Sequence, residues 1–176
     1  MKRSLSVLLI LILPTLFAQV AHAQTQNISV SAHGTGVVPG YACDFGGGLP
    51  GCPNTAGGSK GIKFSFSFSG TGPGTSGDIP VSGTWSATEP DTGIKIEWAT
   101  GFAFVRLFLH ELQLDGTCIM TTPLTGESQL GACQLAAQDG AQNGRVDQIR
   151  FQVFADNGQF VASGELASGN ISINAK

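Results

Sequence analysis

The chain has 176 residues, a formal net charge of −3 and 25 glycines. No cluster of basic residues occurs along it, which argues against nucleic acid or an anionic membrane as a partner. The high glycine content disfavours helices and favours tight turns, and the length suits one domain with one hydrophobic core.

The first 23 residues predict a secretory signal peptide. Met1-Lys2-Arg3 is a basic start, an uncharged and largely apolar run extends from Ser4 to Val20, and Ala21-His22-Ala23 is a small-x-small cleavage site. The apolar run is too short to span a bilayer comfortably. We therefore expect cleavage after Ala23 and one secreted domain at residues 24–176, without a transmembrane segment, in the periplasm, at the cell surface or in the extracellular space.

The part that follows the leader predicts short strands separated by turns. Asn27–Gly34 alternates weakly between apolar and polar residues and predicts a first strand. A Gly- and Pro-rich stretch at residues 36–61 follows, which we expect to be a loop. Ile62–Ser69 is the clearest strand of the chain, because its four apolar side chains alternate with one lysine and three serines.

The next segments predict a hairpin. Ile79–Ala87 alternates again, although Pro80 indicates a strand start or an edge. Ile94–Trp98 is its expected partner, and the turn residues at Glu89–Gly93 join the two.

An apolar stretch at Phe102–Leu109 is interrupted only by Arg106. Apolar residues on both faces predict a central strand that is covered on both sides. The phase of the apolar residues then changes, which indicates a bulge or a corner near His110.

The rest of the chain continues the pattern of strands and turns. Further strands are expected at Leu112–Met120, Ala132–Gln138, Gln148–Phe154, Gln159–Leu166 and Asn170–Ile173. Asp156-Asn157-Gly158 is typical of a two-residue hairpin connection. About nine or ten short strands predict an all-β fold, either an antiparallel β-sandwich, which we favour, or a closed barrel.

The four cysteines predict two disulfide bonds, because an even number in an exported chain is typical of paired cysteines. Three pairings are possible, and we favour Cys43–Cys52 and Cys118–Cys133, since each pair brackets a segment that reads as a loop. A zinc site would need Cys-x-x-Cys spacing or paired histidines, and the chain has neither.

Several turn motifs resemble those of a known family. They are Asp139–Asp147, Ile149–Val153, Ala162–Leu166, Gly169–Ile173 and the early hairpin at Trp85–Ile96. Through them, residues 60–173 resemble the small secreted β-modules called post-COAP (post choice-of-anchor) domains. The resemblance implies an extracellular or surface β-module with no established activity, usually attached to something larger.

Candidate catalytic residues are few. Only His33 and His110 remain after removal of the leader, and no Gly-x-Ser-x-Gly elbow accompanies them. Glu111 follows His110 directly, but adjacent residues of a strand point to opposite faces. We therefore assign no catalytic residue.

A pair of carboxylates is the other catalytic arrangement that the sequence leaves open. The acidic candidates are Asp78, Asp91, Glu97, Glu111, Asp115 and Glu165. Glycoside hydrolysis needs two carboxyl groups at a defined separation, which the sequence does not reveal. Most of the six lie in turns or on polar strand faces, which favours structural roles.

The best candidates for a metal site are Asp139, Asn143 and Asp147, whose oxygens are ligands of the kind that Ca²⁺ takes. Their spacing differs from that of the twelve-residue calcium loop, and its final Glu is absent. Ordinary turn roles are favoured, and we expect no other cofactor.

Trp85, Trp98 and Tyr41 are candidates for a sugar-stacking platform. The two tryptophans are in phase with neighbouring isoleucines, which favours a position in the core.

Taken together, these patterns predict a non-catalytic exported interaction or structural module of the cell surface or envelope, with a protein or glycan partner. A small secreted hydrolase or lyase on the same fold is the first alternative, using His110 or two carboxylates. A glycan-binding or fibre-forming subunit is the second, in which the strand Asn27–Gly34 is donated to a neighbouring molecule.

Overall fold

The computed structural model describes residues 26–39, 41–45, 60–74, 77–123, 126–141, 144–155 and 158–176, with the backbone alone for residues 41–45. These residues form eleven strands and one short 3-10 helix, η1 (Leu107–Leu109). The strands are β1 (Asn27–Val38), β2 (Tyr41–Phe45), β3 (Ile62–Pro73), β4 (Asp78–Pro80), β5 (Ser82–Thr88), β6 (Lys95–Arg106), β7 (Glu111–Thr121), β8 (Ser128–Gln138), β9 (Gln148–Ala155), β10 (Gly158–Glu165) and β11 (Ser168–Ala175).

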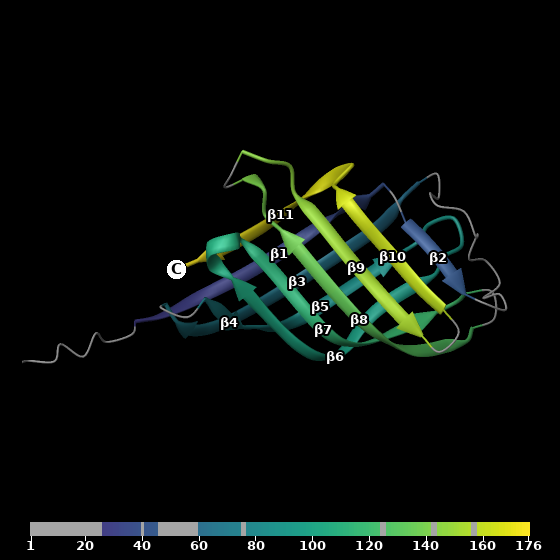
Figure 1. Cartoon of the computed structure of the whole chain (residues 1–176), viewed down its shortest axis with the longest axis horizontal. Coiled ribbons are helices and arrows are strands. Elements are labelled where there is room, and N and C mark those ends of the chain that lie inside the picture. The colour runs from purple at the N-terminus through teal and green to yellow at the C-terminus, as the bar shows by residue number, and fades with distance from the viewer. Residues whose placement is uncertain are drawn as a thin grey trace, which may run out of the picture.

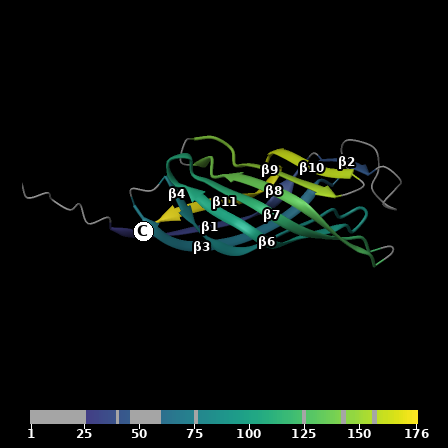
Figure 2. The same ribbon diagram turned by 60° about the horizontal axis from the view of Figure 1, so that its bottom comes forward.

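The described strands belong to one antiparallel sheet. Its order is β11-β1-β3-β5-β6-β7-β8-β9-β10-β2, and the short β4 pairs with β6 beside this path. The sheet curls over itself, so that β8, β9 and β10 cross in front of β1, β3 and β5 (Figure 1). The turned view shows β9 and β10 on the opposite side of the molecule from β3 (Figure 2). The predicted all-β antiparallel fold is confirmed, and its two layers are the two halves of a single sheet.

The hydrophobic core lies between these two halves. In β3 the three phenylalanines are buried and the serines between them are exposed, as the period of two requires. Trp85 of β5 meets Phe151 of β9 with 5.1 Å between ring centroids, so the two halves are in direct contact. Burial of one such aromatic side chain contributes about 1.5–3 kcal/mol, which favours the curled sheet over a flat one.

Two predictions along the chain are wrong in detail. The stretch at residues 36–61 contains a strand, β2, which pairs with β10 although about 115 residues separate the two in sequence (Phe45 opposite Gly158, for example). The predicted strand Ile79–Ala87 is two strands, because β4 pairs with residues 104–106 of β6 whereas β5 pairs with β3 and with residues 95–97 of β6. Pro80 lies at the end of β4, where its missing N–H donor interrupts a ladder least.

The apolar stretch at Phe102–Leu109 is not a central strand covered on both sides. It is the end of β6 followed by η1, and the side chains of Phe102 and Phe108 are 82% and 72% exposed. Within this stretch Ala103 and Val105 are buried in the core, and Leu107 packs against it while partly exposed. Bulky residues on the outer face of β6 give the same sequence pattern as a doubly covered strand.

A corner at His110 is confirmed. This residue follows η1 and takes the left-handed conformation, with φ 49° and ψ 49°, and its N–H donates to the Leu107 carbonyl oxygen over 3.2 Å. Among the described residues it is the only one other than glycine with a positive φ. A register shift also occurs in the β6–β7 ladder, but between Trp98 and Thr100.

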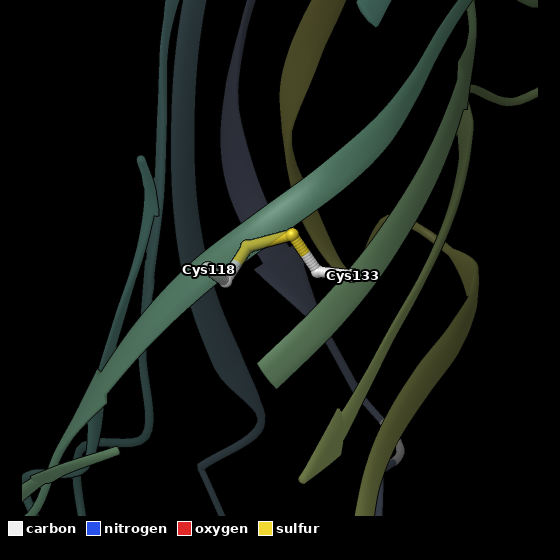
Figure 3. The surroundings of a disulfide bond; sticks show 2 residues. All are labelled: Cys118 and Cys133. Carbon is white, nitrogen blue, oxygen red and sulfur yellow. A yellow bond between two sulfur atoms is a disulfide. The ribbon is translucent and has the colours of Figure 1, made fainter. Parts of the chain in front are cut away.

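The Cys118–Cys133 disulfide is confirmed, and it joins β7 to β8 in the core (Figure 3). Both residues are buried, with 5.7 Å between their Cα atoms. Gly131 lies opposite Cys118 and Gly116 lies opposite Cys133, so no side chain competes with the sulfur atoms for space. The other predicted disulfide, Cys43–Cys52, lies outside the described residues, because these include neither Cys52 nor the side chain of Cys43.

Candidate functional site

A groove crosses the outer face of the sheet over β6, β7, β8 and β9. The register of these strands places their outward side chains in rows that run across the sheet. The two rows at the groove are Phe104, Gln113, Ala136 and Arg150, and Phe102, Asp115, Gln134 and Gln152, and all of these except Phe102 line it. Neighbouring strands lie about 4.8 Å apart, so adjacent side chains within a row are in reach of one another.

Ala136 marks the centre of the groove. Its methyl group is short, whereas Gln113 and Arg150 on either side of it in the row are long. A hollow of about 310 Å³ therefore lies above this part of β8. A volume of this size is at the lower end of the range for small-ligand pockets, about 300–1,000 Å³.

Hydrogen bonds hold the polar side chains of this first hollow. Gln134 Nε2 donates to Asp115 Oδ2 over 3.4 Å. Arg150 Nε donates over 3.2 Å to the side-chain oxygen of Gln152, with this amide turned so that its oxygen faces the guanidinium. Each amide uses only part of its capacity of two donated and two accepted hydrogen bonds.

A second hollow, of about 400 Å³, adjoins the first and shares Ala136 and Arg150 with it. It extends the site to β10, and its other lining residues are Glu111, Gln138, Gln148, Ile149, Ser163 and Gly164. The two hollows lie side by side over the strands from β6 to β10, and we call them together the polar groove.

The polar groove has an aromatic wall on β6. Phe104 lines the first hollow, and the more exposed Phe102 lies two residues away on the same face of the strand. The guanidinium of Arg106 lies 5.3 Å from the centre of the Phe104 ring, within the range of a cation–π interaction. The wall thus offers an apolar surface next to hydrogen-bonding groups.

Two of the predicted acidic candidates, Glu111 and Asp115, lie in the polar groove. They lie on the same face of β7 but four residues apart, which is roughly 13 Å between their Cα atoms. Glu165 lies three strands away from Glu111 in its row, roughly 14 Å. Both backbone spacings are longer than the separation of about 5–9.5 Å between the carboxyl groups of glycosidases, so either pair would reach that separation only if its side chains lean toward each other.

The other three acidic candidates lie in ion pairs elsewhere on the surface. Arg106 Nε lies 3.4 Å from Asp78 Oδ1, and Lys95 Nζ lies 2.8 Å from Glu97 Oε1. Lys60 Nζ lies 2.9 Å from Asp91 Oδ1, and this hydrogen-bonded partner raises the pKa of Lys60 above its ordinary value of 10.5.

The two histidines lie apart from each other in the fold, His33 on β1 and His110 at the corner before β7. His33 Nδ1 lies 3.1 Å from Ser67 Oγ on the outer face of β1 and β3. The contact places a serine hydroxyl beside a histidine, as in a catalytic triad. The residues opposite Ser67 and His33 on the next strands are Thr84 and Ser172, however, and not the carboxylate that a triad needs.

The candidate metal residues Asp139 and Asp147 bind backbone N–H groups, and Asn143 lies outside the described residues. Asp139 accepts from Ala141 N at 3.1 Å and from Ile173 N at 3.0 Å. Asp147 accepts from Gly140 N at 2.9 Å and from Ile171 N at 2.6 Å.

These contacts attach the β8–β9 connection to β11, at the end of the sheet. Ile171 and Ile173 donate on the side of β11 that does not pair with β1, so the two carboxylates bind an otherwise open strand edge. We call this arrangement the aspartate clamp. In the parts of the chain that the structure describes, no group of three or more His, Cys, Asp or Glu side chains gathers, and the Ca²⁺ site stays a prediction.

Both tryptophans face the core, as their phase in the sequence predicts. Trp85 is 3% exposed, and Trp98 packs against Phe68 with 5.4 Å between ring centroids. Their indole nitrogens are buried without a hydrogen-bond partner among the described residues. The core position that the sequence favours for both tryptophans is confirmed, so neither is available to a sugar-stacking platform. The side chain of the third candidate, Tyr41, lies outside the described residues.

Sequence reasoning missed the amides of the polar groove. The signal was present as glutamines on the polar faces of three strands, for example Gln113, Gln134 and Gln152. Glutamine at such a position is unremarkable in one strand, and only the register of β7, β8 and β9 collects these side chains into one site.

Comparison of the chain with protein-family models, with curated proteins and with solved structures finds no match. The likeness to post-COAP modules therefore stays a prediction from sequence motifs. Within the described residues, no helix is long and apolar enough to cross a membrane.

Proposed function

We propose that the chain is a non-catalytic exported module of the cell surface or envelope, and that it binds its partner in the polar groove. The observation that carries this proposal is the pair of adjoining hollows on one open sheet face, whose most frequent lining residue is glutamine. Amides donate and accept hydrogen bonds, but they do not titrate near neutral pH or act as nucleophiles. Such a lining suits the holding of a ligand better than its chemical conversion.

Export is supported by two independent features. Residues 1–23 have the basic start, apolar run and cleavage site of a secretory signal peptide. The buried Cys118–Cys133 disulfide is of the kind that persists in oxidising compartments such as the periplasm or the extracellular space. The resemblance to post-COAP modules also implies an extracellular or surface location.

The alternative functions have less support. A hydrolase that uses Glu111 and Asp115 would need their side chains to lean toward each other, because their Cα atoms lie roughly 13 Å apart on β7. A fibre that forms by donation of Asn27–Gly34 would have to break two ladders, because β1 pairs with β11 on one side and with β3 on the other.

The experiment compares the exported protein with the variant Ala136→Phe on an array of extracellular proteins and glycans. A phenylalanine at position 136 fills the hollow from the outer face of β8, where it disturbs no core contact. We expect at least one partner whose binding this variant weakens at least tenfold. N-terminal sequencing of the exported wild type should begin at Gln24.

Two results would contradict the proposal. One is measurable turnover of an ester, a peptide or a glycoside by the purified wild type. The other is a partner whose affinity is the same for the wild type and for Ala136→Phe, because such a partner binds away from the polar groove.

A further inference from the structure

We propose that the ligand of the polar groove is a neutral oligosaccharide that lies across the strands from β6 to β10. This inference rests on the proposed function and names the class of ligand. Three properties of the groove support it: the hydrogen-bonding groups, the charge and the shape together with the aromatic wall.

The hydrogen-bonding groups of the groove match those of a sugar. Five glutamines line it or lie in its rows: Gln113, Gln134, Gln138, Gln148 and Gln152. Where the structure gives them a partner, it is a single group, such as the Leu109 carbonyl oxygen for Gln138 or Glu111 for Gln113. The remaining amide donors and acceptors are available to a ligand, and a sugar hydroxyl likewise donates one hydrogen bond and accepts two.

The charge of the groove favours a neutral ligand. Arg150 lies at the junction of the two hollows, with Asp115 in the first hollow and Glu111 in the second. An anionic ligand in the groove would face a carboxylate in each hollow, and a cationic ligand would face the guanidinium. A neutral ligand avoids both repulsions, since like charges in close contact are destabilising.

The shape of the groove favours a chain over a compact molecule. A drug-sized ligand is typically buried over 70–90% of its surface, which needs a deep pocket. Here two shallow hollows of about 310 and 400 Å³ lie side by side on an open sheet face and share Ala136 and Arg150. An extended ligand whose consecutive units occupy consecutive hollows uses this arrangement fully.

The aromatic wall supplies the remaining contact. A pyranose ring has an apolar face of C–H groups, which packs on an aromatic ring while its hydroxyls reach polar neighbours. Phe104 presents such a ring to the first hollow, directly opposite Gln113 in its row. Phe102, 82% exposed, extends this surface past Asp115.

Isothermal titration calorimetry of the exported protein tests the inference. The probes are three neutral hexasaccharides (cellohexaose, maltohexaose and N-acetylchitohexaose), their monosaccharides, and an acidic hexamer of galacturonate. We expect binding of at least one neutral hexasaccharide, with a Kd on the order of 10 μM to 1 mM. Its monosaccharide should bind at least tenfold more weakly, because it occupies one hollow only.

Two variants that replace an alanine of β8 with phenylalanine distinguish a contact in the groove from a general effect of a larger side chain. Ala136→Phe fills the junction of the hollows and should weaken binding at least tenfold. Ala132→Phe makes the same change on the same face of the same strand, outside both hollows, and should leave the Kd within twofold of wild type. Urea unfolding of both variants checks that each is folded.

Each other outcome overturns the sugar assignment. Binding of the galacturonate hexamer alone, no binding of any probe, or equal effects of the two variants contradicts it. If a protein on the array binds instead, and Ala136→Phe weakens that binding, the proposed function stands and only the ligand class is wrong. If Ala136→Phe leaves every partner's affinity unchanged, both proposals fail.

Discussion

The substitution Asp139→Asn tests the aspartate clamp. This side chain is 4% exposed, and its two carboxylate oxygens accept hydrogen bonds from Ala141 N and Ile173 N. Asparagine has nearly the same shape, but it replaces one of these acceptors with an NH₂ donor, which then faces a backbone N–H. One charge-assisted hydrogen bond is lost, and a buried donor is left without an acceptor.

The expected cost follows from these two losses. A hydrogen bond to a charged group contributes about 1.5–3 kcal/mol, so we expect the free energy of unfolding to fall by about 2 kcal/mol. For a domain of this size, about 1 kcal/mol shifts Tm by roughly 2–4 °C, which gives a decrease of roughly 4–8 °C.

Urea unfolding at pH 7, followed by the fluorescence of the two core tryptophans, measures this change. Asp78→Asn is the control, because it makes the same chemical change in a surface ion pair with Arg106. An exposed pair contributes at most about 1 kcal/mol. Amide hydrogen exchange should also become faster at Ile173 in the clamp variant and stay unchanged in the control.

A clamp variant as stable as the Asp78→Asn control would refute this reasoning. Unchanged protection of the Ile173 amide would have the same meaning, because that N–H would then have another acceptor.

Three further predictions follow from the fold. Replacement of both Cys118 and Cys133 by alanine should lower the free energy of unfolding by about 3 kcal/mol, the value for a loop of about 15 residues, and urea unfolding with and without a reducing agent checks this. His110→Gly should leave Tm unchanged or raise it, since a side chain in the left-handed conformation costs about 1–2 kcal/mol, whereas His110→Val should lower Tm. Asp91 raises the pKa of Lys60 in the folded state, so the ion pair stabilises the wild type relative to Lys60→Met by its full amount at neutral pH and up to about pH 10. This small stability difference should vanish as the pH rises above the folded-state pKa, and urea titrations across that range measure it.

The parts of the fold that were predictable depend on local pattern. The burial of β3 follows from alternation within one strand, and the hairpin of β5 and β6 follows from its turn residues. That turn is held by the buried Glu89, whose carboxylate accepts from Asp91 N at 2.9 Å and from Thr92 N at 2.5 Å.

The parts that were not predictable depend on contacts between distant segments. β2 is a strand because it pairs with β10, and no feature of the sequence at residues 41–45 predicts that pairing. The polar groove requires the register of β7, β8 and β9, which alone brings Gln113, Ala136 and Arg150 into one row. Alternation within a strand shows which face a side chain occupies but not which neighbours it meets across the sheet.

The Cys118–Cys133 disulfide has a consequence for the proposed binding in the polar groove, because Cys133 lies directly before Gln134 and on the opposite face of β8. The covalent link between β7 and β8 fixes the relative position of two strands that carry the floor of the groove, before any ligand arrives. Less conformational entropy is then lost on association, so a preformed site gains affinity without any new contact. A copy of the chain held in a reducing cytosol would lack this covalent link, and we expect the proposed binding in the polar groove to be weaker there.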